Sequence, residues 1–210
     1  MRENQDKIES TIKSYYDDMV KTYGANHNGV DWNSSESQYL RFEQLDKVIR
    51  EKRDAEFSII DFGCGYGELV NFLNQRYNSF EYVGLDISVE MLKQAKQKHN
   101  QINIFFAQHL HELDEKDYLL ASGIFNIKQQ TKLIDWDNYC LELLNEFNRF
   151  CRKGFSFNVL TKYSEESQKK SYLYYADPLY LFDYCKKHFS RNVALLHDYS
   201  LFEFTLIVRK

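Results

Sequence analysis

The residues best suited to chemistry lie in a glycine-rich turn that follows an apolar, β-branched run. The segment Asp61-Phe62-Gly63-Cys64-Gly65-Tyr66-Gly67 closes a strand pattern and opens a helical one. Glycine is needed where a ligand lies against the backbone, because a Cβ atom would block the approach. The N–H groups at the start of the following helix are free for polar contacts. The turn therefore predicts a ligand-binding site.

The spacing of the glycines distinguishes two classes of ligand. Dinucleotide-binding turns follow the pattern GxGxxG, but here the third glycine position is occupied by Glu68. Asp61 precedes the turn, where a carboxylate would repel a pyrophosphate and attract a cationic aminoacyl sulfonium group. A second acid, Asp86, ends the segment Val83-Gly84-Leu85-Asp86 and is suited to the two hydroxyls of a ribose. These features favour S-adenosylmethionine over NAD.

Together the two segments resemble the class I S-adenosylmethionine-dependent methyltransferases over roughly residues 57–130. Asp61–Gly67 is similar to the first motif of that family, Asp86 to its ribose-binding acid, and residues 117–126 to the end of its fourth strand. Two features depart from the family: Gln108-His109-Leu110 stands where an acid often contacts the adenine amine, and strand four lacks an Asn/Asp-Pro-Pro-Tyr/Phe motif. The resemblance implies a methyltransferase that uses S-adenosylmethionine.

The predicted cofactor-binding residues come from the strand ends and from the N-terminal segment. They are Asp61, Gly63, Cys64, Gly65, Gly67, Asp86, Ile87, Gln108, His109, Ser122, Gly123, Gln38 and Arg41. Arg41 shares a helix face with Gln38 and is our candidate for binding the carboxylate of the cofactor, because a guanidinium binds carboxylates in bidentate fashion.

The acceptor is expected at the carboxyl ends of the later strands. The predicted acceptor-binding residues are Asn126, Thr161, Tyr163, Tyr174, Tyr175 and Tyr199. His197 is the first candidate for a general base and His111 the second, since an ordinary histidine pKa of about 6.5 leaves the ring largely neutral near pH 7. No metal site is expected.

Alternating strand and helix patterns predict a Rossmann-like α/β fold. We expect a seven-stranded, mostly parallel sheet of order 3-2-1-4-5-7-6, with strand seven antiparallel and helices on both faces. The predicted strands are Phe57–Phe62, Glu81–Leu85, Asn103–Ala107, Tyr118–Ile124, Phe155–Leu160, Val193–His197 and Leu201–Val208. The predicted helices are Glu68–Arg76, Ser88–Lys98, a long one along Trp136–Cys151, and Pro178–His188.

Residues 1–56 are predicted to form a helical lid over a compact domain of residues 57–210. Ser35 and Gln38 have the spacing of a capping box, which would open a helix near Glu36. Phe42, Leu45, Val48 and Ile49 would then share one face of that helix. Tyr15, Tyr16, His27, Trp32 and Arg41 are expected to line the underside of the lid.

Composition limits the possible partners. The chain has 210 residues and a net charge of −4, with no basic block, so nucleic acid is disfavoured as a partner. No apolar run reaches membrane-spanning length and no signal peptide is evident, so a cytoplasmic protein with reduced thiols is expected. The sequence leaves the oligomeric state open.

The expected reaction is methyl transfer from S-adenosylmethionine to a small polar metabolite, at an oxygen. The tyrosine-rich second half and residues 121–126 also resemble stand-alone enzymes that methylate bacterial sugars and surface-polysaccharide precursors. One alternative is a methyltransferase acting on protein or RNA. Another is a non-catalytic partner subunit that binds S-adenosylmethionine.

Overall fold

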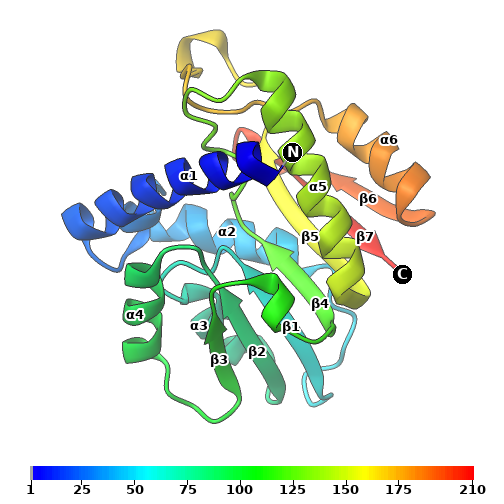
Figure 1. Ribbon diagram of the computed structural model, residues 1–210. Coiled ribbons are helices and arrows are strands. Elements are labelled where there is room, and N and C mark those ends of the chain that lie inside the picture. Colours follow the sequence, from blue (N-terminus) through cyan, green and yellow to red (C-terminus); the bar gives the residue numbers. More distant parts are fainter. Residues whose placement is uncertain (1) are drawn as a thin grey trace.

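A single seven-stranded sheet runs through the molecule (Figure 1). The computed structural model describes residues 2–210. The strand order is β3-β2-β1-β4-β5-β7-β6, and β7 alone runs antiparallel to its neighbours. The strands are β1 (Phe57–Phe62), β2 (Phe80–Leu85), β3 (Ile104–Ala107), β4 (Lys116–Ala121), β5 (Cys151–Leu160), β6 (Asn192–Leu196) and β7 (Glu203–Arg209). The predicted fold class and strand order are confirmed.

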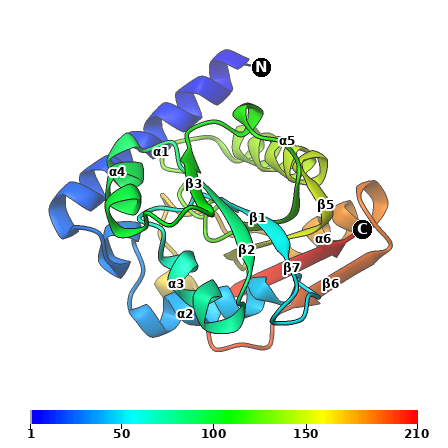
Figure 2. The same ribbon diagram turned by 90° about the horizontal axis from the view of Figure 1, so that it is seen from below.

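Helices cover both faces of the sheet (Figure 2). One face packs against α1 (Arg2–Tyr23), α5 (Leu133–Phe150) and α6 (Pro178–His188), and the other against α2 (Ser35–Asp46) and α3 (Glu68–Arg76). Helix α4 (Val89–Lys98) lies beside the β3 edge. Three short 3₁₀ helices are η1 (His27–Val30), η2 (Leu110–Glu112) and η3 (Glu166–Gln168).

The long helix α5 illustrates how the sequence builds the core. Its apolar residues recur every three or four positions, so they form one stripe that packs on the sheet. Trp136, Leu144 and Phe147 have 0% exposure, and the Trp136 indole donates a hydrogen bond to the Phe125 carbonyl at 3.1 Å. Cys151, predicted at the end of this stripe, is instead the first residue of β5.

Several predicted boundaries are wrong by a few residues. The N-cap of α2 is Ser34, whose side chain accepts from the Ser37 N–H, so the capping box lies one residue earlier than Ser35 and Gln38. Helix α2 ends at Asp46, and the buried Val48 and Ile49 follow in the next turn. Strand β4 ends at Ala121 rather than Ile124, because Gly123 adopts a φ of +70° and the chain turns.

The N-terminal segment lies over the carboxyl ends of the central strands (Figures 1 and 2). Ile8 and Ile12 of α1 join the core beneath α5, which anchors this helix to the sheet domain. A second contact comes from Asp17, whose carboxylate accepts a hydrogen bond from Ser88, the N-cap of α4. Within residues 2–210, none of the helices is long and apolar enough to cross a membrane.

Candidate cofactor and acceptor cavities

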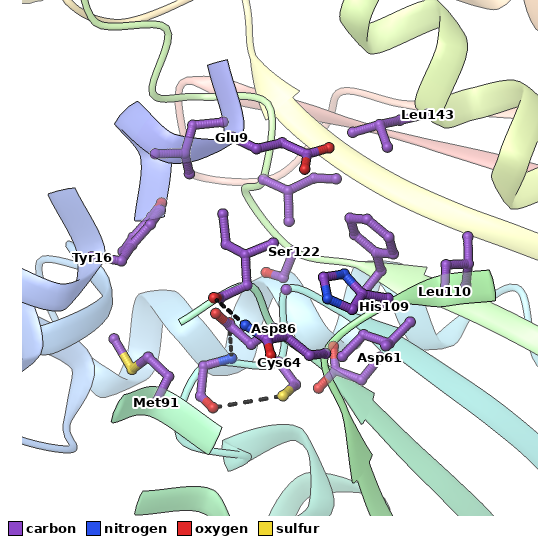
Figure 3. A pocket seen from close by; sticks show the side chains of 18 of the residues that line it. Glu9, Tyr16, Asp61, Cys64, Asp86, Met91, His109, Leu110, Ser122 and Leu143 are labelled. Carbon is purple, nitrogen blue, oxygen red and sulfur yellow. Dashed lines mark hydrogen bonds between the residues drawn. The ribbon is translucent and has the colours of Figure 1, made fainter. Parts of the chain in front are cut away.

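A cavity of about 820 Å³ opens at the carboxyl ends of β1, β2 and β4 beneath α1 (Figure 3). It brings together most of the residues predicted for the cofactor: Asp61, Gly63, Cys64, Gly65, Asp86, Ile87, Gln108, His109, Ser122 and Gln38. His111, the second candidate base, also lines it and stacks on His109 at 5.3 Å between ring centroids.

The glycine turn is held against β2 by the backbone. The N–H groups of Gly63 and Cys64 both donate to the Leu85 carbonyl at 2.8 Å. Gly65 has a φ of +54°, and a Cβ atom there would lie 2.9 Å from Val30 Cγ1. Burial raises the pKa of the Cys64 thiol, so this cysteine stays protonated and unreactive. The turn therefore presents backbone, not a reactive side chain, to the cavity.

Two carboxyl groups line the larger cavity beside the glycine turn: that of Asp61 is buried and that of Asp86 is half-buried. Asp86 accepts from the N–H groups of Gly65 and Ser88, both at 2.8 Å, and Asp61 accepts from the Tyr82 hydroxyl at 2.7 Å. Burial, reinforced by Asp86, raises the pKa of Asp61 to about 7. Burial likewise raises the pKa of Asp86 to about 6, although its two backbone donors oppose the shift. Each group ionises more readily when a cation binds beside it.

These shifts predict that S-adenosylmethionine binds more weakly at acidic pH. Asp61 takes up a proton below its pKa of about 7 and loses its attraction for a cation. Asp86 takes up a proton below its pKa of about 6 and becomes a weaker acceptor for the ribose hydroxyls. Affinity should fall by up to about tenfold per pH unit below each pKa. Calorimetry from pH 8 to pH 5.5 measures this. In Asp61→Asn, the affinity should no longer change with pH near pH 7. If the affinity of the wild-type protein did not depend on pH, the two carboxyl groups would not take part in binding.

The residues of the larger cavity fit S-adenosylmethionine. The Oγ atom of Ser122 is buried and has no hydrogen-bond partner among the described residues, so a ligand group can satisfy it. Asp86, directly after β2, would hold the ribose, and Asp61, near the end of β1, would face the cationic aminoacyl end. When bound, the cofactor supplies an electrophilic methyl group on a positively charged sulfur.

A smaller cavity of about 320 Å³ lies beside the larger one, at the ends of β4 and β5. It contains two of the residues predicted to bind the acceptor, Asn126 and Tyr175. Its other polar side chains are Asp31, Asn33, Arg41, Ser164, Gln168, Lys170, Tyr172 and Glu203. Its acidic and basic side chains are equal in number, which favours an uncharged polar ligand over an ion.

The structure contradicts the assignment of His197 as general base. His197 is exposed just after β6, at the sheet edge farthest from β3, and lines neither cavity. Its ring packs near Tyr163 and Phe204, both 6.0 Å away between centroids. The prediction was wrong because lying at the correct end of the sheet is not enough: β6 is the edge strand, and its neighbour β7, whose Glu203 lines the smaller cavity, stands between His197 and the site.

Four of the predicted acceptor-binding residues also line neither cavity. The Tyr174 hydroxyl is held by Asp137 at 2.6 Å and that of Tyr199 by Thr205 at 2.9 Å, so both belong to the packing of the fold. Thr161 is buried at the end of β5, and Tyr163 is 59% exposed. Of the four tyrosines predicted to bind the acceptor, only Tyr175 lines the smaller cavity.

Three predicted cofactor residues have other roles. Arg41 is paired with Glu203 through its Nε and Nη2 atoms at 3.0 and 2.5 Å and lines the smaller cavity, so its guanidinium is not free for the cofactor carboxylate. Gly67 caps α3 with a φ of +80°, and a Cβ atom there would meet the His99 ring, not the cavity. Gly123 borders the smaller cavity and packs against Trp32.

Two helix faces complete the larger cavity, and of their residues only Tyr16 was predicted to line the site, as part of the lid. From α1 come Gln5, Glu9, Ile12 and Tyr16, and from α5 come Tyr139, Glu142, Leu143 and Glu146. Both sets recur every three or four residues, so a helical periodicity of partly polar residues was the signal. No cluster of three or more metal-ligating side chains is found in the described part of the chain.

Comparisons with known proteins agree with this geometry. A family model for a methyltransferase domain matches residues 59–154. A protein of Mycobacterium tuberculosis that bears a provisional methyltransferase name is 45% identical over 155 residues, which cover 73% of this chain and 93% of that protein. Trans-aconitate 2-methyltransferase of Afipia carboxidovorans is 33% identical over 106 residues, which cover 46% of this chain and 40% of that enzyme.

Solved structures share the fold at low sequence identity. Magnesium protoporphyrin IX methyltransferase of Synechocystis PCC 6803 with bound S-adenosylmethionine superposes with a TM-score of 0.64 at 14% identity. The match covers 98% of this chain and 97% of that one. At this identity the likeness supports the fold alone.

Proposed function

Because this chain belongs to the class I S-adenosylmethionine-dependent methyltransferases, we propose that it methylates a small polar metabolite at an oxygen atom. The acceptor class is a sugar, a nucleotide-linked sugar or a surface-polysaccharide precursor. The smaller cavity is the proposed acceptor site, and the larger cavity holds the cofactor.

One observation carries this proposal: the smaller cavity is polar, compact and directly beside the larger one. Its volume of about 320 Å³ suits a ligand of one or two sugar rings and leaves no room for a folded macromolecule. In the smaller cavity, the positive charge of Arg41 is balanced by Glu203. Lys170 and Asp31, which also line it, carry opposite charges. Hydroxyl and amide groups between them can pair with the hydroxyls of an uncharged polyol.

The test is a panel assay that follows release of S-adenosylhomocysteine. The panel contains neutral monosaccharides, nucleotide sugars, trans-aconitate as a polyanion, bulk RNA and unfolded protein. Turnover with sugars or nucleotide sugars supports the proposal. Turnover confined to RNA, protein or the polyanion would overturn the acceptor assignment. Tight binding of the cofactor without any turnover would favour the non-catalytic partner subunit.

We further propose that Asp31 takes the proton of the acceptor hydroxyl, in place of His197. Asp31 lines the smaller cavity, and the Tyr15 hydroxyl donates to its carboxylate at 2.8 Å, which fixes its direction. As the new C–O bond forms and the methyl–sulfur bond breaks, the hydroxyl proton passes to this carboxylate. Asp31 is also the C-cap of η1, in the left-handed conformation with a φ of +59°, which aspartate adopts more readily than most residues.

Asp31→Asn should lower kcat by about a hundredfold with the best acceptor of the panel, because the amide cannot take up a proton. Asparagine tolerates the left-handed backbone conformation as well as aspartate, so the loop should be preserved. The dissociation constant of S-adenosylmethionine should stay within twofold of the wild-type value. Asp18→Asn, on the exposed side of α1, is the matched control. A loss of less than threefold in Asp31→Asn would exclude this residue as the base.

A further inference from the structure

Three residues lie on the walls of both cavities: Tyr16 of α1, Val30 at the end of η1, and Trp32 just beyond it. A group that moves from the larger cavity to the smaller one has to pass between them. We propose that Tyr16 and Trp32 form an aromatic portal that holds the sulfonium methyl group of S-adenosylmethionine and directs it toward the acceptor. This inference rests on the proposed function, since it takes the smaller cavity as the acceptor site.

The indole of Trp32 is fixed on one face and along one edge. The Arg41 guanidinium stacks on its ring at 3.8 Å from the centroid. The six-membered edge lies against Gly123, where a Cβ atom would come within 2.2 Å of Cη2. Any other residue at position 123 would therefore push the indole away. The rest of the ring is left to border the two cavities.

A buried network holds these supports in place. Glu203, 1% exposed, accepts three hydrogen bonds from Nε and Nη2 of Arg41 and one from the Asn158 amide. Asn158 in turn accepts from the Gly123 N–H at 2.9 Å. The contacts close a ring that joins α2, β4, β5 and β7 to Trp32. Four elements of the fold thus fix the position of the indole. A portal that aligns reacting atoms requires such a fixed side chain.

Tyr16 forms the opposite side of the boundary. Its ring packs edge-to-face on Tyr15 at 5.3 Å and 82°, which limits its movement. Burial raises the pKa of its phenol, and so do Asp31 from the side of the smaller cavity and Asp86 from the side of the larger. The phenol therefore stays neutral and cannot serve as a base at physiological pH. Its contribution is the ring face and a hydroxyl that donates hydrogen bonds.

Aromatic faces are chemically suited to a sulfonium group. The negative face of an aromatic ring attracts a cation, most strongly when water is excluded. Val30 completes the boundary from above the glycine turn, since its Cγ1 occupies the space over Gly65. S-adenosylhomocysteine has a neutral sulfur and no transferable methyl, so it gains nothing from this attraction. A portal of this kind therefore distinguishes the cofactor from its product.

The experiment compares the dissociation constants of S-adenosylmethionine and S-adenosylhomocysteine by calorimetry, without any acceptor. Trp32→Leu and Tyr16→Leu remove an aromatic face and should each lower the preference for S-adenosylmethionine over S-adenosylhomocysteine by about three- to tenfold. Trp32→Phe and Tyr16→Phe keep an aromatic ring, so these variants should retain most of the preference for S-adenosylmethionine. Tyr23→Leu, which alters a tyrosine of α1 that is 52% exposed and lines neither cavity, is the control.

The affinity for S-adenosylhomocysteine reports whether each variant still folds around the ligand. An unchanged preference in both leucine variants, with S-adenosylhomocysteine still bound, would overturn the portal. A second readout is tryptophan fluorescence. The chain has two tryptophans, so the variant Trp136→Phe keeps only Trp32. Its emission should change more with S-adenosylmethionine than with S-adenosylhomocysteine, and equal changes would contradict the proposal. Neither measurement involves an acceptor, so the portal can fail while the proposed function stands, and the panel assay can fail while the portal stands.

Discussion

Gly65→Val is expected to weaken the binding of both S-adenosylmethionine and S-adenosylhomocysteine by more than about a hundredfold, which corresponds to about 2.7 kcal/mol. The backbone at position 65 has a φ of +54° and lines the larger cavity. A Cβ atom there would stand 2.9 Å from Val30 Cγ1, and two further methyl groups would fill the space against which the ligand lies. The same side chain would also displace Val30, which closes the cavity from above.

The matched control is Gly24→Val. Gly24 also has a positive φ, +76°, but a Cβ atom there meets only Asn26 at 3.9 Å and lies outside both cavities. It carries the same backbone strain without the loss of ligand space. Calorimetry with both ligands and far-UV circular dichroism separate the two effects. A Gly65→Val protein that keeps its fold and binds within threefold of wild type would show that the turn does not contact the cofactor.

Glu203→Ala is expected to destabilise the protein by about 3–5 kcal/mol, because it leaves Arg41 buried without a counterion. Both side chains are nearly inaccessible, at 8% for Arg41 and 1% for Glu203. Asn158 loses its acceptor in the same variant, so a buried amide is left unsatisfied as well. Replacing both charges, in Arg41→Met with Glu203→Leu, should cost far less, since no isolated charge remains.

Denaturant unfolding measures these differences. Lys187→Ala removes one partner of an exposed pair with Asp183, whose side chains are 68% and 58% accessible, and should change the stability by about 1 kcal/mol or less. The expected order of loss is Glu203→Ala, then the double variant, then Lys187→Ala. If Glu203→Ala were as mild as Lys187→Ala, water would have to reach Arg41, and the network behind Trp32 would not be rigid.

The fold was largely predictable because its signals are local. Most parallel strands contain a short apolar run, the long helix α5 has a clear apolar stripe, and the glycine turn identifies β1 by itself. The predicted boundaries are wrong where a contact with a distant part of the chain determines the end of an element. Strand β4 stops at Ala121 because the following turn packs Gly123 against Trp32, which lies about ninety residues earlier in the chain.

The part of the larger cavity formed by strand ends and turns was also predictable, because its sequence signals are local. Asp61, Gly65 and Asp86 lie within strand ends and turns whose geometry the local sequence determines. Arg41 and His197 depend on distant parts of the chain: Arg41 is neutralised by Glu203, 162 positions away, and His197 follows the edge strand β6, whose neighbour β7 lines the smaller cavity through Glu203. Side-chain pairing between remote elements leaves no local pattern, so these assignments needed the structure.

The most direct test of the acceptor assignment uses S-adenosylmethionine with a labelled methyl group. The protein is incubated with a cell extract that has been separated into a low-molecular-weight fraction and a macromolecular fraction, and the label is followed in each. A polar cavity of about 320 Å³ predicts transfer into the low-molecular-weight fraction, into products that are uncharged at the methylated group and stable to mild base, as an ether is. Label found only in protein or RNA would contradict the account.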